Sequence, residues 1–181
     1  MTHAGDKTES VSRIKAIVKK DERKEVKMYK KILVPLDGSD LAECVLPHVE
    51  SIAKGCGVRE VILLRVTEPF HQLCIYDGCI SQDVINSIDA GNKAAAEKYL
   101  SQLIKRTRYD GVPVTPKVIT GAPAESIADY ASRDSIDLIV IATHGRSGIS
   151  RWTWGSVADR VLHSACVPVL MVRAPGCVPN I

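Results

Sequence analysis

The feature that most constrains the fold is an alternation, from Lys30 onward, of short β-branched runs with longer amphipathic segments. The apolar centres of Glu60–Thr67 and Asp137–Ala142 are continuous, which is typical of strands covered on both faces of a parallel sheet. The segments between the runs have helical spacing. The expected strands are Lys31–Leu36, Glu60–Thr67, Val112–Ile119, Asp137–Ala142 and Val167–Arg173, and the expected helices are Asp40–Lys54, Asp83–Arg108, Pro123–Arg133 and Ser156–Ala165.

This order predicts an α/β fold: a doubly wound, Rossmann-like, five-stranded parallel sheet with helices on both faces. The 181 residues suit one such domain with an appendage. We expect a charged N-terminal extension over residues 1–28, either flexible or a short helix, the α/β domain over 29–174, and a C-terminal tail over 175–181. The long stretch Glu68–Gln82, with Pro69 and Gly78, is expected to be a loop near a site.

Three expected helices carry start signals. Asp40 has Glu43 three residues on, Pro123 stands at a first turn, and Ser156 has Asp159 three residues on. The sequence Gly-Cys-Gly at 55–57 is interpreted as a helix stop. Of the six cysteines, Cys44 and Cys166 are expected at buried helical positions, where a free thiol behaves as a small apolar group.

The charge distribution argues against nucleic-acid binding. Residues 1–27 hold eight of the 24 basic and five of the 21 acidic residues, so the remainder of the chain carries 16 of each. A neutral main body lacks the concentrated basic face that nucleic acid requires. No apolar run approaches the roughly 20 residues of a membrane span, and the N-terminus has no signal-peptide pattern. We therefore expect a cytoplasmic protein that binds no membrane, and the cysteine spacing predicts no metal site.

The chemistry is expected where the strands end, because ligands of open parallel sheets bind outside the carboxyl ends. Asp37-Gly38-Ser39-Asp40 follows the first strand, and a glycine-containing loop over 143–155 precedes Ser156 at a helix start. Glycines and free amides at a helix N-terminus suit a phosphate group. The spacing alone allows a second interpretation, in which the glycines form a turn and Ser156 caps its helix.

Three separated motifs resemble the universal stress protein family: Val34–Ser39, Asp137–His144 before the glycine loop, and Gly155-Ser156-Val157 leading to Cys166–Leu170. The resemblance covers about residues 29–174. Nucleotide-binding members have the pattern G-x2-G-x9-G-[ST], which falls on Ala142, Gly145, Gly155 and Ser156 here, so the first glycine is replaced by alanine.

The resemblance implies a nucleotide site with adenosine at one end and phosphates at the other. Asp37 would accept a hydrogen bond from the nucleoside, although Asp-Gly-Ser also suits a turn. Arg146 and Arg151 could pair with phosphate or remain solvated, and His144 is interpreted as a loop hydrogen-bonding residue rather than a general base. The implied nucleotide-binding residues are Pro35, Leu36, Asp37, Val66, Ala142, Gly145, Arg146, Gly155, Ser156 and Val157.

The function that the resemblance implies is an ATP-binding stress-response regulator, with AMP or ADP as alternative ligands. The nucleotide could bind with or without Mg²⁺. It would act as a homodimer paired through the last strand, Val167–Arg173, together with an unidentified protein partner. Hydrolysis would be slow at most, because no base, metal cluster or arginine clamp stands out, and no catalytic residue is predicted. The alternative is a member that works by protein interaction without nucleotide. An adenylating enzyme would need an S-G-G-x-D-S-type loop, which residues 37–40 do not supply.

Overall fold

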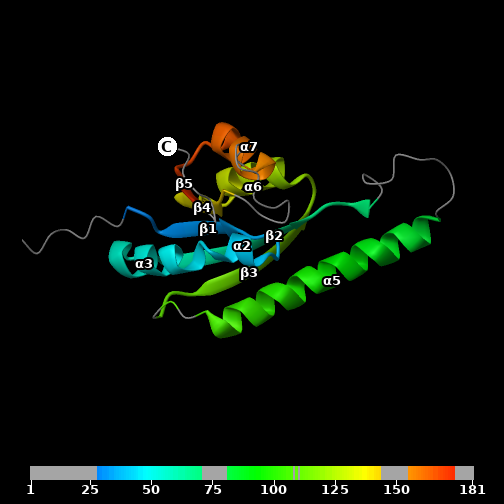
Figure 1. Ribbon diagram of the computed structural model, residues 1–181, viewed down its shortest axis with the longest axis horizontal. Helices are drawn as coiled ribbons and strands as arrows, with labels where there is room; N and C mark the ends of the chain where they lie inside the picture. The colour runs from blue at the N-terminus through cyan, green and yellow to red at the C-terminus, as the bar shows by residue number, and fades with distance from the viewer. Residues whose placement is uncertain (1–27, 71–80, 108, 110, 144–154, 174–181) are drawn as a thin grey trace, which may run out of the picture.

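The computed structural model describes residues 28–70, 81–107, 109, 111–143 and 155–173. All the strand pairs are parallel, and they form one sheet in the order β3-β2-β1-β4-β5 (Figure 1). The chain moves outward from β1 to β3 and then returns to add β4 and β5 on the other side. The predicted doubly wound parallel sheet is therefore confirmed. The strands are β1 (Lys31–Pro35), β2 (Glu60–Thr67), β3 (Val114–Thr120), β4 (Leu138–Ala142) and β5 (Val169–Val172).

Helices cover both faces of the sheet (Figure 1). Strand β2 shows why: Leu63 packs into a core on one face and Leu64 into a second core on the other, since successive side chains point to opposite sides. Such strands must be buried twice, which explains their continuous apolar runs. One face is covered by α2 (Asp40–Glu43), α3 (Leu46–Cys56) and α5 (Gln82–Arg106), and the other by α6 (Pro123–Arg133) and α7 (Ser156–Ser164).

The expected single helix over Asp40–Lys54 is wrong, because the segment forms two helices, α2 and α3. Pro47 stands in the first turn of α3. Proline has no backbone N–H to continue the hydrogen-bond ladder of a preceding helix, and it is well tolerated in a first turn. The break leaves α2 as a short helix directly after β1, beside the carboxyl edge of the sheet.

Two helices, α2 and α7, begin at the expected residues Asp40 and Ser156 but are capped differently from the prediction. The N-cap of α2 is Ser39 rather than Asp40, and its hydroxyl accepts the Ala42 N–H at 3.2 Å. The N-cap of α7 is Gly155, so Ser156 is its first helical residue and not its cap. Pro123 does stand in the first turn of α6, and Gly57 ends α3 in the left-handed conformation (φ 63°), as predicted.

The cysteine prediction fails at Cys166, which is exposed and lies after the end of α7. Cys44 is half-buried and lies between α2 and α3. Strand β5 is shorter than the expected Val167–Arg173, and β3 begins two residues later than expected. The described residues contain no helix both long and apolar enough to cross a membrane. The expected extension over 1–28, apart from Met28, and the tail over 175–181 lie outside the described residues.

Candidate functional site

A cavity of about 700 Å³ lies at the carboxyl edge of the sheet, where the strand order reverses between β1 and β4. Its walls come from the ends of β1, β2 and β4, from the start of α7, and from α5 and α6. Ligand sites in proteins typically have volumes of roughly 300–1,000 Å³, and doubly wound sheets bind ligands at this crevice. Volume and position therefore both make the cavity the candidate site.

The cavity brings together all the predicted binding residues that the structure describes. Their side chains or backbones come from three strand ends and one helix start, which are far apart in the sequence. Gly145 and Arg146 lie outside the described residues, as do His144 and Arg151. The structure shows that the described residues lie around one cavity, and their role in binding stays a prediction. The predicted binding residues that line the cavity are Pro35, Leu36, Asp37, Val66, Ala142, Gly155, Ser156 and Val157.

Asp37 takes part in the turn that follows β1. Its Oδ1 accepts hydrogen bonds from the Ser39 backbone N–H at 2.9 Å and from the Ser39 hydroxyl at 2.6 Å. Ser39 in turn caps α2, and Gly38 between them has φ 81°, a conformation that favours glycine. The turn role considered for Asp37 is thus real, and any contact with a ligand would come in addition to it.

The start of α7 is held beside the end of β4. The Gly155 N–H donates to the Thr143 carbonyl at 2.7 Å, and the Thr143 N–H donates to the Val172 carbonyl of β5 at 2.8 Å. Among the residues that the structure describes, no side chain caps the start of α7 with a hydrogen bond. The amides of the first helical turn have no acceptor within their own helix, and they carry the positive end of the helix dipole. Because Gly155, Ser156 and Val157 line the cavity, this helix end can receive an anionic group there.

Ala142 replaces the first glycine of the motif, and the structure shows where its methyl group goes. Ala142 ends β4, is 6% exposed, and belongs to the core on the α5 face of the sheet while also lining the cavity. The methyl group is therefore packed against apolar neighbours of the core, on the opposite face from α7.

The sequence reasoning missed Arg65 and a face of α5. Arg65 is half-buried in β2, and its Nη1 donates to the Leu36 carbonyl at 3.2 Å. It is the only cationic side chain among the described lining residues. The α5 residues that line the cavity follow the i, i+3, i+4, i+7 spacing of one helix face, and this spacing in the sequence could have identified them. They are Asn92, Ala95, Ala96 and Tyr99.

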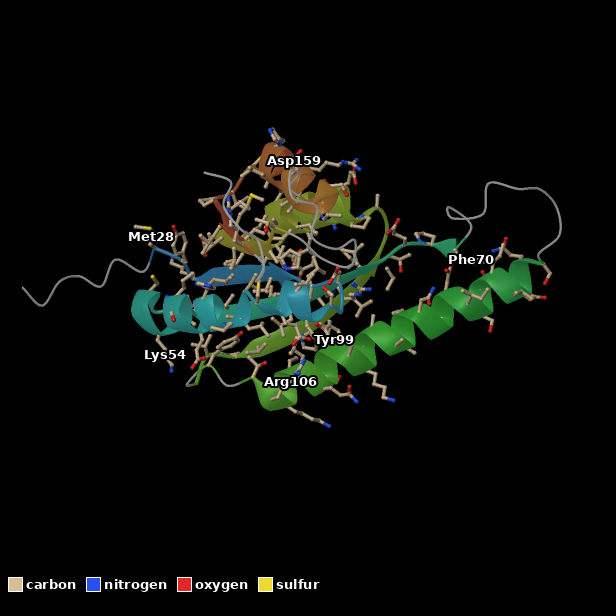
Figure 2. The ribbon with its side chains drawn as sticks, in the orientation of Figure 1. Met28, Lys54, Phe70, Tyr99, Arg106 and Asp159 are labelled. Carbon is tan, nitrogen blue, oxygen red and sulfur yellow. The ribbon has the colours of Figure 1, made fainter. Side chains whose placement is uncertain are left out.

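A polar cluster joins α5 to α2 beside the cavity, and Figure 2 labels its two α5 members, Tyr99 and Arg106. The Tyr99 hydroxyl donates to Glu43 Oε1 at 2.9 Å, and Arg106 Nη2 donates to Glu43 Oε1 and Oε2 at 2.8 and 2.6 Å. Burial raises the pKa of the Tyr99 hydroxyl, the Glu43 carboxylate raises it further, and the charges of Arg106 and Arg65 act in the opposite direction. The phenol therefore stays neutral and acts as a hydrogen-bond donor.

Comparison with known proteins identifies the family of the chain. The model of the universal stress protein family matches residues 28–173, which is most of the chain. The chain belongs to the universal stress protein family. Universal stress protein MJ0531 of Methanocaldococcus jannaschii is 32% identical over 148 residues, covering 82% of this chain and 84% of that protein. MJ0577 of the same organism is 31% identical over 156 residues, covering 81% and 96%.

Solved structures show the same fold as this universal stress protein. The structure of MJ0577 has a TM-score of 0.71 and 29% identity, covering 82% of this chain and 99% of that chain. A universal stress protein in complex with cAMP has a TM-score of 0.59 and 21% identity, covering 81% and 98%. An Arabidopsis thaliana family member with AMP bound has a TM-score of 0.54 and 19% identity, covering 81% and 93%. At these identities the last two establish the fold alone.

Proposed function

We propose that this universal stress protein binds an adenine nucleotide, with ATP as the leading candidate, in the cavity at the carboxyl edge of its sheet. The observation that carries the proposal is that eight of the binding residues implied by the family resemblance line one cavity of about 700 Å³. The cAMP and AMP complexes of proteins with this fold support the choice of an adenine nucleotide.

The chemistry of the walls fits the parts of such a nucleotide. Val66 and Ile127 supply apolar surface for the base, and Asp37 supplies a carboxylate for a ribose or base donor. The first turn of α7, which no described side chain caps, supplies amides for the phosphates. The protein would hold the nucleotide by packing, one acceptor and backbone donors, with slow hydrolysis at most.

The bound ligand can be identified on the full chain. Native mass spectrometry of the purified protein is expected to show a mass increment equal to that of an adenine nucleotide. Calorimetric titration of the nucleotide-free protein with ATP, ADP and AMP at fixed Mg²⁺ should then give saturable heats. The absence of any saturable heat, with the fold intact by circular dichroism, would contradict the proposal.

The second candidate is a member that acts by protein interaction alone, and Ala142 favours it because it replaces the first glycine of the motif that the family resemblance implies for nucleotide binding. The two candidates differ in the response to Ala142→Gly. If nucleotide binds, restoring the glycine should leave ATP affinity equal or raise it, while loss of the core methyl group lowers stability by about 1 kcal/mol. If the protein acts by interaction alone, neither form binds ATP.

We further propose that the protein works as a homodimer and a nucleotide-linked stress-response regulator with a separate protein partner. Pairing through the last strand is supported by the open edge of β5, where Leu170 is 38% exposed. No strand of the described residues pairs with the outer side of β5, and a second copy adding its own β5 there would satisfy the backbone groups of that edge. Nucleotide binding would then change the surface through which the dimer contacts its protein partner.

A further inference from the structure

Just after β1, the Arg65 side chain of β2 holds the backbone at Leu36. The register of β1 with β2 ends at Pro35 opposite Leu64, and the next amide, Leu36 N–H, donates to the Leu64 carbonyl at 2.9 Å. The Leu36 carbonyl then accepts from the Arg65 guanidinium at 3.2 Å. Arg65 thus holds the peptide that joins Leu36 to Asp37, which is the residue that turns the chain toward α2.

Arg65 is itself well placed to hold this peptide. In β2, Leu64 and Val66 pack on the α6 face, so Arg65 between them is directed to the α5 face. There it is half-buried, and its charge acts on Tyr99 of α5. A partly buried guanidinium needs hydrogen-bond acceptors, so its geometry is restricted by the same contacts that it makes.

From Arg65 the constraint continues to the cavity. The carbonyl that Arg65 holds belongs to the peptide directly before Asp37, and the Asp37 carboxylate is held on its other side by Ser39. Leu36, Asp37 and Arg65 all line the cavity. We propose that Arg65 is a positioning residue for the ligand site, which sets the direction of the Asp37 carboxylate by holding the Leu36 carbonyl. This inference rests on the proposed nucleotide site.

The proposal makes a specific prediction for a ligand series. Arg65→Met keeps a shorter, unbranched apolar stem and removes the donors, so the affinities for adenosine, AMP and ATP should fall by the same factor, about tenfold. An arginine that contacted phosphate directly would instead give a loss that grows from adenosine to ATP. Arg65→Lys keeps a donor without the planar fork and should recover part of the affinity for all three ligands.

A second measurement tests the positioning without any ligand. Hydrogen exchange of the Ser39 amide, which donates to Asp37, should be several times faster in Arg65→Met than in the wild type. Arg59→Met is the matched control, because Arg59 is exposed, precedes β2 at its other end and does not line the cavity. It should leave Ser39 exchange and all three affinities unchanged.

The outcomes separate the two proposals. Equal losses for the three ligands with faster Ser39 exchange support positioning by Arg65. Unchanged Ser39 exchange, or a loss that increases with the number of phosphates, overturns it. Wild-type protein that binds none of the three ligands overturns the nucleotide site, and with it a ligand role for Arg65, even if the exchange result shows that Arg65 orders the turn.

Discussion

Tyr99 and Tyr109 both lie on the α5 face of the sheet, but their hydroxyl groups differ in hydrogen bonding. The Tyr99 hydroxyl donates to Glu43, whereas the Tyr109 hydroxyl is buried and has no hydrogen-bond partner in the part of the chain that the structure describes. A buried hydroxyl without a partner costs free energy, and its removal can be neutral or stabilising. Tyr109→Phe should therefore leave the melting temperature unchanged or raise it by up to about 3 °C.

The matched variant is Tyr99→Phe, which removes a hydroxyl that has an acceptor. It should lower the free energy of unfolding by about 1 kcal/mol, or roughly 2–4 °C in melting temperature. Thermal unfolding of the wild type and both variants by calorimetry gives the comparison. Equal destabilisation by the two substitutions would mean that the Tyr109 hydroxyl has a partner of its own.

Asp37 should respond differently to two substitutions. Asp37→Ala removes the acceptor for Ser39 and should lower stability by about 1 kcal/mol, as well as nucleotide affinity by about 1.5–3 kcal/mol. Asp37→Asn keeps an oxygen acceptor for the turn, so it should retain most of the stability while it weakens a charge-assisted bond to the ligand. Chemical denaturation and ATP calorimetry separate the two effects. Wild-type affinity in both variants would limit Asp37 to the turn.

Residues at the cavity could be predicted where a turn or a helix start marks them in the sequence. Asp37 and Gly155 follow or precede regular elements at a sheet edge, so their position was predictable. Arg65 was not, because one charged residue inside an apolar strand gives no sign of which backbone group it will meet 29 residues away. The Ser39 cap was missed because Asp40 and Glu43 offered an equally good capping pattern.

At the scale of elements, the pattern of apolar residues predicted each strand and α6 to within a few residues. The strands could be predicted because burial on both faces of the sheet gives short apolar runs, and α6 because burial on one face gives helical spacing. The break between α2 and α3 was missed because the helical spacing continues across it. Pro47 was the residue that marked it, since the residue before a proline is disfavoured in a helix. The position of α7 depends on the Gly155–Thr143 hydrogen bond, a contact across the 144–154 segment that no local pattern encodes.

The α2–α5 contact should contribute to stability through Glu43. Its side chain is 16% exposed and accepts from both Tyr99 and Arg106 of α5. Glu43→Ala leaves the Tyr99 hydroxyl without this acceptor and should cost about 1–2 kcal/mol, a value reduced because Arg106 is 61% exposed.

The matched control for this contact is Glu125→Ala, which removes the exposed bridge to Arg160 between α6 and α7. That change should cost at most about 0.5 kcal/mol. Chemical denaturation measures both free energies. A loss in Glu43→Ala no larger than that in Glu125→Ala would show that the cluster adds nothing beyond an exposed ion pair.

For the whole molecule, the two edges of the sheet differ in a way that bears on assembly. Strand β3 carries the exposed residues Thr115, Pro116 and Lys117, which discourage pairing with another strand. Strand β5 is entirely apolar, and its residue Leu170 is exposed. If the homodimer forms through β5, Leu170→Lys places one positive charge from each protomer in the interface. The dimer should then dissociate to a monomer, as measured by light scattering.

Val84→Lys is the control for this test, because Val84 is an apolar residue (48% exposed) on α5, a helix that lies apart from β5 (Figure 1). It should leave the mass unchanged. A Leu170→Lys protein that keeps the wild-type dimer mass would place the interface elsewhere. A wild-type protein that is monomeric at all concentrations would remove the dimer from the proposed function.

The most direct test of the nucleotide site is ATP affinity after a side chain is added at the start of α7. Gly155 has φ −56° and ψ 135°, a conformation open to any residue, so Gly155→Val can fold while its side chain blocks the approach of phosphate to the backbone. Gly91→Val is the control, since an added Cβ there meets nothing within 4 Å.

Calorimetric titration with ATP at fixed Mg²⁺, after circular dichroism has shown each variant to be folded, gives the decisive comparison. We predict that the wild type and Gly91→Val bind ATP with equal affinity and that Gly155→Val loses at least about 100-fold, the equivalent of one or two charge-assisted hydrogen bonds. A folded Gly155→Val protein with wild-type ATP affinity would contradict the assignment of the phosphates to the α7 N-terminus.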